Sequence, residues 1–278
     1  METMIGLGSA GCNIAEKFEK YPQYNIHYVD SASRKYKNFI KVDFQVSIEA
    51  YEDKYTPLDF SKISGPTCLI VGGSGAISGI VLRILDQLKH LPLYVLYIRP
   101  DLDVLTETAQ KRERVVFGVL QQYARSALLE KIYIVDNVKV DNAIGEVSIK
   151  NYWDAVNDTI VYTIHMINVF DNTEPEMTTF SSIVDTVRIA TLGVLDLDSG
   201  EEKLFFDLQS PREKLYYYAI NKKSLESESN LFKKITNQVK SHAEDNVRSS
   251  YAIYSTEHNE NYVYTVHYAS LVQREIIS

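Results

Sequence analysis

Apolar runs alternate with segments of helical periodicity along the first half of the chain. A short unbroken apolar run predicts a buried strand, and apolar residues spaced three or four apart predict a helix. The predicted strands are 4–8, 26–30, 39–46, 68–71, 93–98 and 132–135, and the predicted helices are 10–20, a segment ending at residue 90, and 107–129. This alternation indicates an α/β fold with a parallel sheet, whose ligands bind at the carboxyl ends of the strands.

The second half begins with a long predicted helix at 153–170, and Pro175 ends its helical pattern. Apolar residues at helical spacing predict another helix at 180–192. Strands rich in Tyr, Val and Ile follow, interrupted by one predicted helix at 226–242. We therefore expect an α/β ligand-binding domain at 1–150, a long central helix with its following loop at 151–176, and a smaller α+β C-terminal domain at 177–278.

Composition and charge argue against several classes of function. The chain has 278 residues, of which 45% are hydrophobic, and a net charge of −8, which speaks against a nucleic-acid binder. Two cysteines, Cys12 and Cys68, cannot form a disulfide framework, and the histidines have no ligand spacing, so we expect no metal site. No signal peptide and no membrane-spanning run are evident, so we expect a cytoplasmic protein without membrane insertion.

The first candidate chemistry is a glycine-rich loop between a predicted strand and a predicted helix. It reads Gly6-Leu7-Gly8-Ser9-Ala10-Gly11-Cys12-Asn13, and Asp30 ends the next strand about twenty residues on. Glycines let backbone N–H groups at a helix start approach a phosphate closely. Taken alone, this motif predicts an NAD-binding Rossmann domain, and the alternative is a turn that binds nothing.

A second glycine loop follows the strand at 68–71 and reads Gly72-Gly73-Ser74-Gly75-Ala76-Ile77-Ser78-Gly79. Two such loops suggest that both hold one polyphosphate, whereas a Rossmann domain needs only one. The alternative is helix capping by Ser74 or Ser78. Because backbone must touch phosphate at Gly8 and Gly73, we expect Gly73→Val to abolish binding in a protein that stays folded.

These two loops, in this order, resemble the tubulin/FtsZ superfamily. Its first loop is similar to residues 6–13, and its signature loop, GGGTGTG or GGTGSG, resembles Gly72-Gly73-Ser74-Gly75-Ala76, although Ile77 stands where the family usually has a further glycine. Neither loop has the lysine of a P-loop. The short chain looks most like the small phage- or plasmid-type (TubZ- and PhuZ-like) members.

The resemblance implies a protein that binds GTP or GDP, with Mg²⁺ as an accompanying ion. The nucleotide-binding residues that it implies are Gly8, Ser9, Ala10, Asn13, Gly72, Gly73, Ser74, Gly75, Ala76, Glu107, Lys111, Arg112, Asn137, Trp153 and Asn157.

Two groups among them have specific implied roles. Glu107 and the pair Lys111-Arg112 would meet the ribose and the terminal phosphate, unless they form a surface ion pair. Trp153 and Asn157 share one helix face, so Trp153 would stack on guanine and Asn157 would bond its edge. The alternative for Trp153 is packing of the helix against the sheet.

Hydrolysis in the family uses acids on a loop after the central helix, which act on the nucleotide of the next subunit. Counting the family's usual helix length from Trp153 reaches 177–182, where Thr179 and Ser182 replace both carboxylates. A second alignment, with a shorter helix, offers Asp171 and Glu174. We prefer the first, because a helix at 180–192 would follow directly, and then a double substitution of Asp171 and Glu174 should change little.

The segment between the third strand and Cys68 also lacks the Gly-Ala-Gly loop that senses the terminal phosphate in the family, and only Gly65 is present. The leading hypothesis is a GTP-binding cytoskeletal protein that assembles head to tail into filaments, with weak or absent GTPase activity. The alternatives are a non-polymerising relative that binds a partner, such as another tubulin-like protein, and an NAD-dependent enzyme, which the second glycine loop disfavours.

Overall fold

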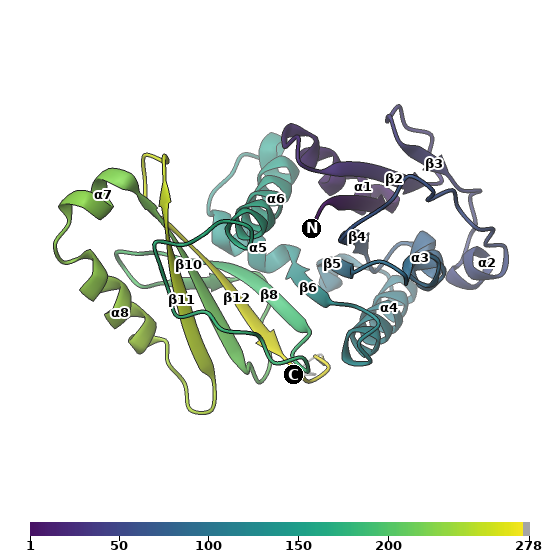
Figure 1. Cartoon of the computed structure of the whole chain (residues 1–278). Helices are drawn as coiled ribbons and strands as arrows, with labels where there is room; N and C mark the ends of the chain where they lie inside the picture. Colours follow the sequence, from purple (N-terminus) through teal and green to yellow (C-terminus); the bar gives the residue numbers. More distant parts are fainter. Residues whose placement is uncertain (275–278) are drawn as a thin grey trace.

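The computed structural model describes residues 1–274, in which the strands form one continuous sheet (Figure 1). Its order is β3-β2-β1-β4-β5-β6-β8-β12-β10-β11-β7, and β9 pairs with β8 beside this path. The first six strands are β1 (Thr3–Leu7), β2 (Asn25–Asp30), β3 (Phe39–Lys41), β4 (Thr67–Gly72), β5 (Leu93–Arg99) and β6 (Lys131–Asp136). All of them pair in parallel, as the alternating pattern predicts.

Helices cover both faces of this parallel part. They are α1 (Gly8–Lys17), α2 (Ile48–Asp53), α3 (Val81–Leu88), α4 (Glu107–Arg125), α5 (Asn137–Ile144) and α6 (Tyr152–Phe170), with short 3₁₀ turns at Phe18–Lys20, Ala76–Ile80, Leu102–Val104 and Ile149–Asn151. One core layer joins α1 and α6 to the sheet, and a second joins α2, α3 and α4 to its other face. The mixed α/β fold class is confirmed.

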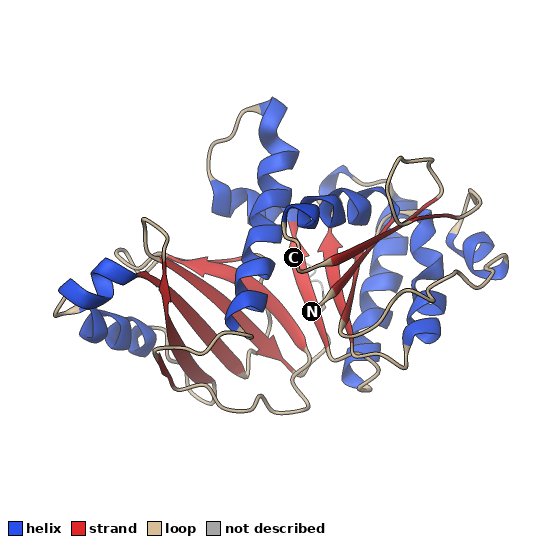
Figure 2. Cartoon of the chain, turned by 45° about the horizontal axis from the view of Figure 1, so that its top comes forward, coloured by secondary structure: helices blue, strands red, loops and turns tan. Residues whose placement is uncertain are grey.

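The second half extends the same sheet. Its strands are β7 (Met177–Thr178), β8 (Ile189–Leu195), β9 (Glu202–Leu204), β10 (Glu213–Asn221), β11 (Arg248–Thr256) and β12 (Tyr262–Ala269), and its helices are α7 (Lys222–Ser227) and α8 (Leu231–Ser241). Figures 1 and 2 show α6 crossing between the two halves of the sheet, while α7 and α8 cover the outer face of the second half. Because α6 packs on strands of both halves, it links them through one core.

The helix predicted at 180–192 is wrong. Residues 189–195 form β8, which is paired between β6 and β12 and almost wholly buried. A strand buried on both faces is an unbroken apolar run, which periodicity cannot distinguish from a buried helix. The polar residues before it form an exposed loop, which Arg248 holds through Ser181 Oγ at 2.9 Å and the Ser182 carbonyl at 2.8 Å.

The structure also differs from the predicted elements in smaller ways. The predicted helix at 226–242 is two helices, because the polar segment between α7 and α8 favours a turn. The strand predicted at 39–46 ends at Lys41, and the chain then turns toward α2, whose first turn is capped by Ser47 (Ala50 N to Ser47 Oγ, 3.2 Å). Helix α5, which was not predicted, starts where Asp136 accepts from the Val138 amide at 2.9 Å.

Backbone hydrogen bonds between β6 and β8 join the two halves of the sheet. Ile132–Ile134 of β6 pair in parallel with Ile189–Thr191 of β8, and the Thr191 hydroxyl donates to the Ile134 carbonyl at 2.9 Å. Both cysteines are buried free thiols. Among residues 1–274, no helix is long and apolar enough to cross a bilayer.

Gly118 in α4 offers a first test of this packing. A Cβ built there meets no atom within 4 Å, so Gly118→Ala should raise the free energy of unfolding by about 0.5–1 kcal/mol through helix propensity. Gly145 is equally uncrowded but has a φ of +75°, so Gly145→Ala should lower it by about 1 kcal/mol. Chemical denaturation of both variants is the measurement, and equal shifts would contradict these assigned conformations.

Candidate functional site

The two glycine loops meet in one cavity of about 360 Å³ at the carboxyl ends of β1 and β4. Its lining comes from loops that are far apart in the sequence. The lining residues are Leu7, Gly8, Ser9, Ala10, Asp30, Ser31, Phe44, Gln45, Tyr51, Gly72, Ser74, Gly75, Ala76 and Ile77. Seven of the predicted binding residues are among them, namely Gly8, Ser9, Ala10, Gly72, Ser74, Gly75 and Ala76.

The first loop passes straight from β1 into α1 at Gly8. The φ of Gly8 is +68°, and a Cβ there would lie 2.7 Å from Cγ2 of Ile77 in the second loop. Only glycine meets both constraints without strain. The two loops are therefore in contact with each other, and each shapes one wall of the same cavity.

The second loop, Gly73–Gly75, precedes the 3₁₀ turn and α3. Neither serine caps a helix here: the Ser78 hydroxyl donates to the Gly75 carbonyl at 2.7 Å, and α3 has no side-chain cap. The capping alternative is therefore wrong. The Ser74 side chain lines the cavity instead, where a hydroxyl can donate to an anion.

A packing constraint that the sequence did not reveal requires glycine at position 73. A Cβ at Gly73 would lie 1.8 Å from the Tyr97 hydroxyl, and Tyr97 is wholly buried. That hydroxyl donates to Glu113 Oε1 at 3.1 Å, so it cannot swing away cheaply. The expectation that Gly73→Val leaves the fold intact is wrong, because the substitution collides with the protein's own core.

The carboxylate of Asp30, at the end of β2, already accepts hydrogen bonds from neighbouring groups. It accepts from the Ser31 amide at 2.8 Å and from Arg34 Nε at 3.2 Å, while Ser9 Oγ lies 3.5 Å away. Arg34 also donates to Asn13 Oδ1 at 2.9 Å. Since Arg34 holds the acid that a Rossmann domain would offer to a ribose, this arrangement disfavours NAD, although the strand order 3-2-1-4-5-6 is compatible with it.

Cys12, in the first turns of α1, is not a nucleophile. Burial, followed by the nearby Asp30 carboxylate, raises the pKa of Cys12 to about 12. The protonated thiol donates to the Gly6 carbonyl at 3.4 Å. A buried thiol of this kind is inert and serves packing.

The start of α6 lies beside α1. Lys17 Nζ lies 3.0 Å from Asp154 and 3.1 Å from Asp158, which fixes the rotation of α6. Asn13 stands one turn before Lys17 on the same face of α1, so it also faces the first turns of α6. These turns carry Trp153 and Asn157, the two residues predicted to bind the base, so Asn13, which was predicted to bind the nucleotide, lies on a neighbouring surface.

Trp153 is 60% exposed and touches Tyr152 edge to face, with ring centroids 5.1 Å apart. Packing of the helix against the sheet therefore does not explain this tryptophan. An exposed indole with a free face is suited to stacking on a planar ligand.

The remaining predicted residues lie outside the lining of the cavity. Glu107 and Lys111 form an ion pair of 2.6 Å in which both side chains are largely exposed, as the surface alternative proposed. Arg112 is on the same helix, and Asn137 begins α5 directly after β6. Gly73, Asn13, Trp153 and Asn157 also do not line the cavity, although Gly73 stands between two residues that do.

The residues after β3 form a further wall of the cavity, which no sequence motif predicted. Phe44, Gln45 and Tyr51 line the cavity there, and no local motif marks them. Gly65 is far from this wall, because it precedes β4 at the amino end of the sheet, where a Cβ would meet the Glu2 carboxylate at 2.3 Å.

The loop after the central helix lies at the opposite end of the sheet from the cavity. Helix α6 ends at Phe170, and the Met1 amine at the start of β1 donates to Asn168 Oδ1 at 2.5 Å. The loop that directly follows holds Asp171 and Glu174. With no helix at 180–192, the reason for preferring the alignment through Thr179 and Ser182 is lost.

The two acids of the second alignment differ in their surroundings. Tyr217 Oη donates to Asp171 Oδ1 at 2.8 Å, which directs that carboxylate toward β10 of its own chain. Glu174 is exposed and has no hydrogen bond or ion pair within residues 1–274. Glu174, unlike Asp171, is therefore available to a second molecule, and so is the exposed Glu176 that precedes β7.

No protein-family model matches the sequence, and no curated protein matches it. Solved structures do match. TubZ from Bacillus thuringiensis serovar israelensis, in a GTPγS-form protofilament, is similar with a TM-score of 0.70 and 15% identity over 97% of this chain and 86% of that chain. CetZ2 from Haloferax volcanii, in a GTPγS-bound protofilament, is similar with a TM-score of 0.67 and 16% identity over 96% and 92%.

An empty FtsZ dimer from M. jannaschii is similar with a TM-score of 0.67 and 10% identity, over 96% of this chain and 87% of that chain. At these identities the likeness concerns the fold. The chain has the tubulin/FtsZ fold over nearly its whole length, so the resemblance drawn from the two glycine loops is confirmed at that level.

Proposed function

We propose that this protein binds guanine nucleotide and assembles head to tail, as a cytoplasmic cytoskeletal protein of the tubulin/FtsZ type. The observation that carries the proposal is the single cavity lined by both glycine loops. Backbone N–H groups at two strand-to-helix turns give it the donors that a polyphosphate needs. The similar TubZ and CetZ2 structures are GTPγS forms, which agrees with this ligand.

The residues present fit GTP better than a firmly held metal ion. Asp30 is the only carboxylate among the described residues that line the cavity, and Arg34 already binds it. Mg²⁺ usually relies on one or two carboxylates together with phosphate oxygens. Here it would depend mainly on phosphate and water, and its role when bound would be to neutralise phosphate charge.

The separation of the two functional ends supports head-to-tail assembly. The five residues of β1 alone span about 16 Å, so Glu174 cannot reach the cavity of its own chain. A second copy stacked on the cavity end would bring its own Glu174 there. The cavity end also exposes the apolar side chains of Phe44, Val46 and Ile149, which suits contact with another protein surface.

Sedimentation with and without GTPγS tests the assembly. The nucleotide should complete the surface at the cavity end, so the protein should pellet with GTPγS and stay in the supernatant without nucleotide. A monomer that binds GTP but never sediments would favour the non-polymerising relative that binds a different partner, such as another tubulin-like protein.

Trp153 offers a direct test of the base site. GTP should quench or shift its fluorescence, because a base stacked on an exposed indole alters its emission. Asn157→Ala should weaken GTP by about tenfold and ATP much less, since a hydrogen bond to the guanine edge is lost. Titration with GTP, ATP and NAD is the measurement, and unchanged emission at saturating GTP would remove Trp153 from the site.

A further inference from the structure

The wall formed by the chain after β3 contains a buried tyrosine with an unused hydroxyl. Tyr51 of α2 is 4% exposed and packs in the core with α3 and α4. It lines the cavity of the glycine loops and also a second cavity of about 190 Å³ behind it. Within residues 1–274 its hydroxyl has no hydrogen-bond partner, so it can donate a hydrogen bond to a ligand in the cavity.

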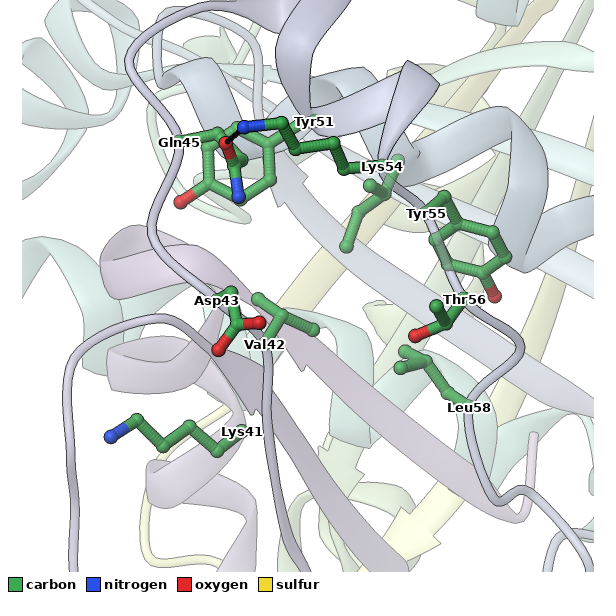
Figure 3. Close-up of a pocket in the computed structure, with 10 residues that line it drawn as sticks. Lys41, Val42, Asp43, Gln45, Tyr51, Lys54, Tyr55, Thr56 and Leu58 are labelled. Atoms are coloured by element: carbon green, nitrogen blue, oxygen red, sulfur yellow. Dashed lines mark hydrogen bonds between the residues drawn. The ribbon is translucent and has the colours of Figure 1, made fainter.

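Gln45 is a second donor on this wall, and Lys54 determines how it is oriented. Lys54 Nζ donates to Gln45 Oε1 at 3.0 Å. Because an ammonium group can only donate, the amide oxygen must face Lys54 and the NH₂ group is left for another acceptor. Figure 3 shows Gln45, Tyr51 and Lys54 on one side of the second cavity, with Lys41 and Asp43 across from them.

The cavity has few other groups that could recognise extra negative charge. No lysine, arginine or histidine is among the described residues that line it. Lys54, acting through the Gln45 amide, brings a positive charge next to this wall. A hydroxyl, an oriented amide and a nearby ammonium group together suit a phosphate that carries charge on several oxygens.

The position of this wall indicates which phosphate it meets. Asn13, Trp153 and Asn157 belong to helices on one face of the sheet, whereas Tyr51 packs on the other face. A nucleotide whose base lies against α6 and whose phosphates cross the two glycine loops therefore points its last phosphate toward Gln45 and Tyr51.

Helix α2 is also packed against the turn that follows the second glycine loop. A Cβ on Gly79 would lie 2.3 Å from the Ile48 carbonyl, so the start of α2 rests directly on the 3₁₀ turn after that loop. Arg83 and Glu52 add an ion pair of 3.3 Å between α3 and α2. Tyr51 therefore belongs to a helix that is in direct contact with the turn after the second loop.

We propose that Tyr51 and Gln45 distinguish GTP from GDP by binding the terminal phosphate, with Lys54 as the residue that positions Gln45. The proposal rests on the proposed function. It assigns to two side chains the recognition that a glycine loop after the third strand performs in the resembling family, a loop that this chain lacks.

Calorimetric titration of GTPγS and GDP tests it. Tyr51→Phe keeps the buried ring, and Gln45→Ala trims a half-buried side chain, so neither should disturb the fold. Each should weaken GTPγS by about tenfold and change GDP by less than about twofold, because one hydrogen bond to a charged group is lost. Lys54→Met should weaken GTPγS in the same selective way by about threefold, since the amide loses its orientation.

Tyr55→Phe is the matched control. The Tyr55 hydroxyl donates to Gln87 Oε1, and Tyr55 lines the second cavity but not the cavity of the glycine loops, so the ratio of the two affinities should stay unchanged. An unchanged ratio in both Tyr51→Phe and Gln45→Ala would overturn this inference while leaving nucleotide binding in place. Unmodified protein that binds neither nucleotide would overturn the proposed function as well, so the two failures are distinguishable.

Discussion

Gly75→Val should abolish nucleotide binding without unfolding the protein. Gly75 lines the cavity, and its φ of −76° is open to any residue. A Cβ there would have only Ile77 Cγ2 nearby, at 3.8 Å, so the protein itself can accept a side chain. The valine methyl groups would occupy the space that a phosphate needs, and the affinity for GTP should fall by at least about 100-fold.

The measurement is GTP titration of Gly75→Val alongside circular dichroism. Gly118→Val is the control, because it makes the same chemical change on α4 where a Cβ meets nothing. It should bind GTP as the unmodified protein does. Gly73→Val is a poor substitute, since its clash with the Tyr97 hydroxyl disturbs the core and loses binding for a different reason. Unaltered affinity in Gly75→Val would show that the second loop does not contact phosphate.

GTP turnover, measured as phosphate release at high protein concentration, should fall by about 100-fold in Glu174→Gln. A positioned carboxylate orients the attacking water, and Glu174 is an exposed acid without a partner on the loop after α6, within residues 1–274. Asp171→Asn should act mainly on stability, because Asp171 accepts from Tyr217 within its own chain. Glu176→Gln is the control, since this neighbouring acid leads into β7 and its backbone amide bonds to Ile253.

Mixing two inactive variants sharpens the test. Gly75→Val supplies an intact Glu174 but binds no nucleotide, and Glu174→Gln binds nucleotide but lacks the acid. If the acid acts on the next subunit, the mixture should recover part of the turnover that neither variant shows alone. Undiminished turnover in Glu174→Gln would return the question to Thr179 and Ser182. Turnover that is independent of protein concentration would argue against a site completed by a second copy.

Local sequence signals determined the parts of this protein that a few neighbouring residues control. The strand, glycines and helix around Gly8 were predictable because a turn into a helix that must approach other backbone demands glycine. The same holds for the loop at Gly72–Gly75. The end of α6 at Phe170 was predictable as well, because its buried stripe stops there and Pro175 follows.

Tertiary structure alone decided the features that depend on distant partners. Residues 189–195 are a strand because β6 and β12 pair with them on both sides, and their apolar run carries no sign of that pairing. Gly73 is constrained by Tyr97, which lies on another strand. Tyr51 and Gln45 join the cavity only because a helix too short to be recognised folds back over it, and Glu174 is isolated from that cavity only because α6 runs to the far end of the sheet.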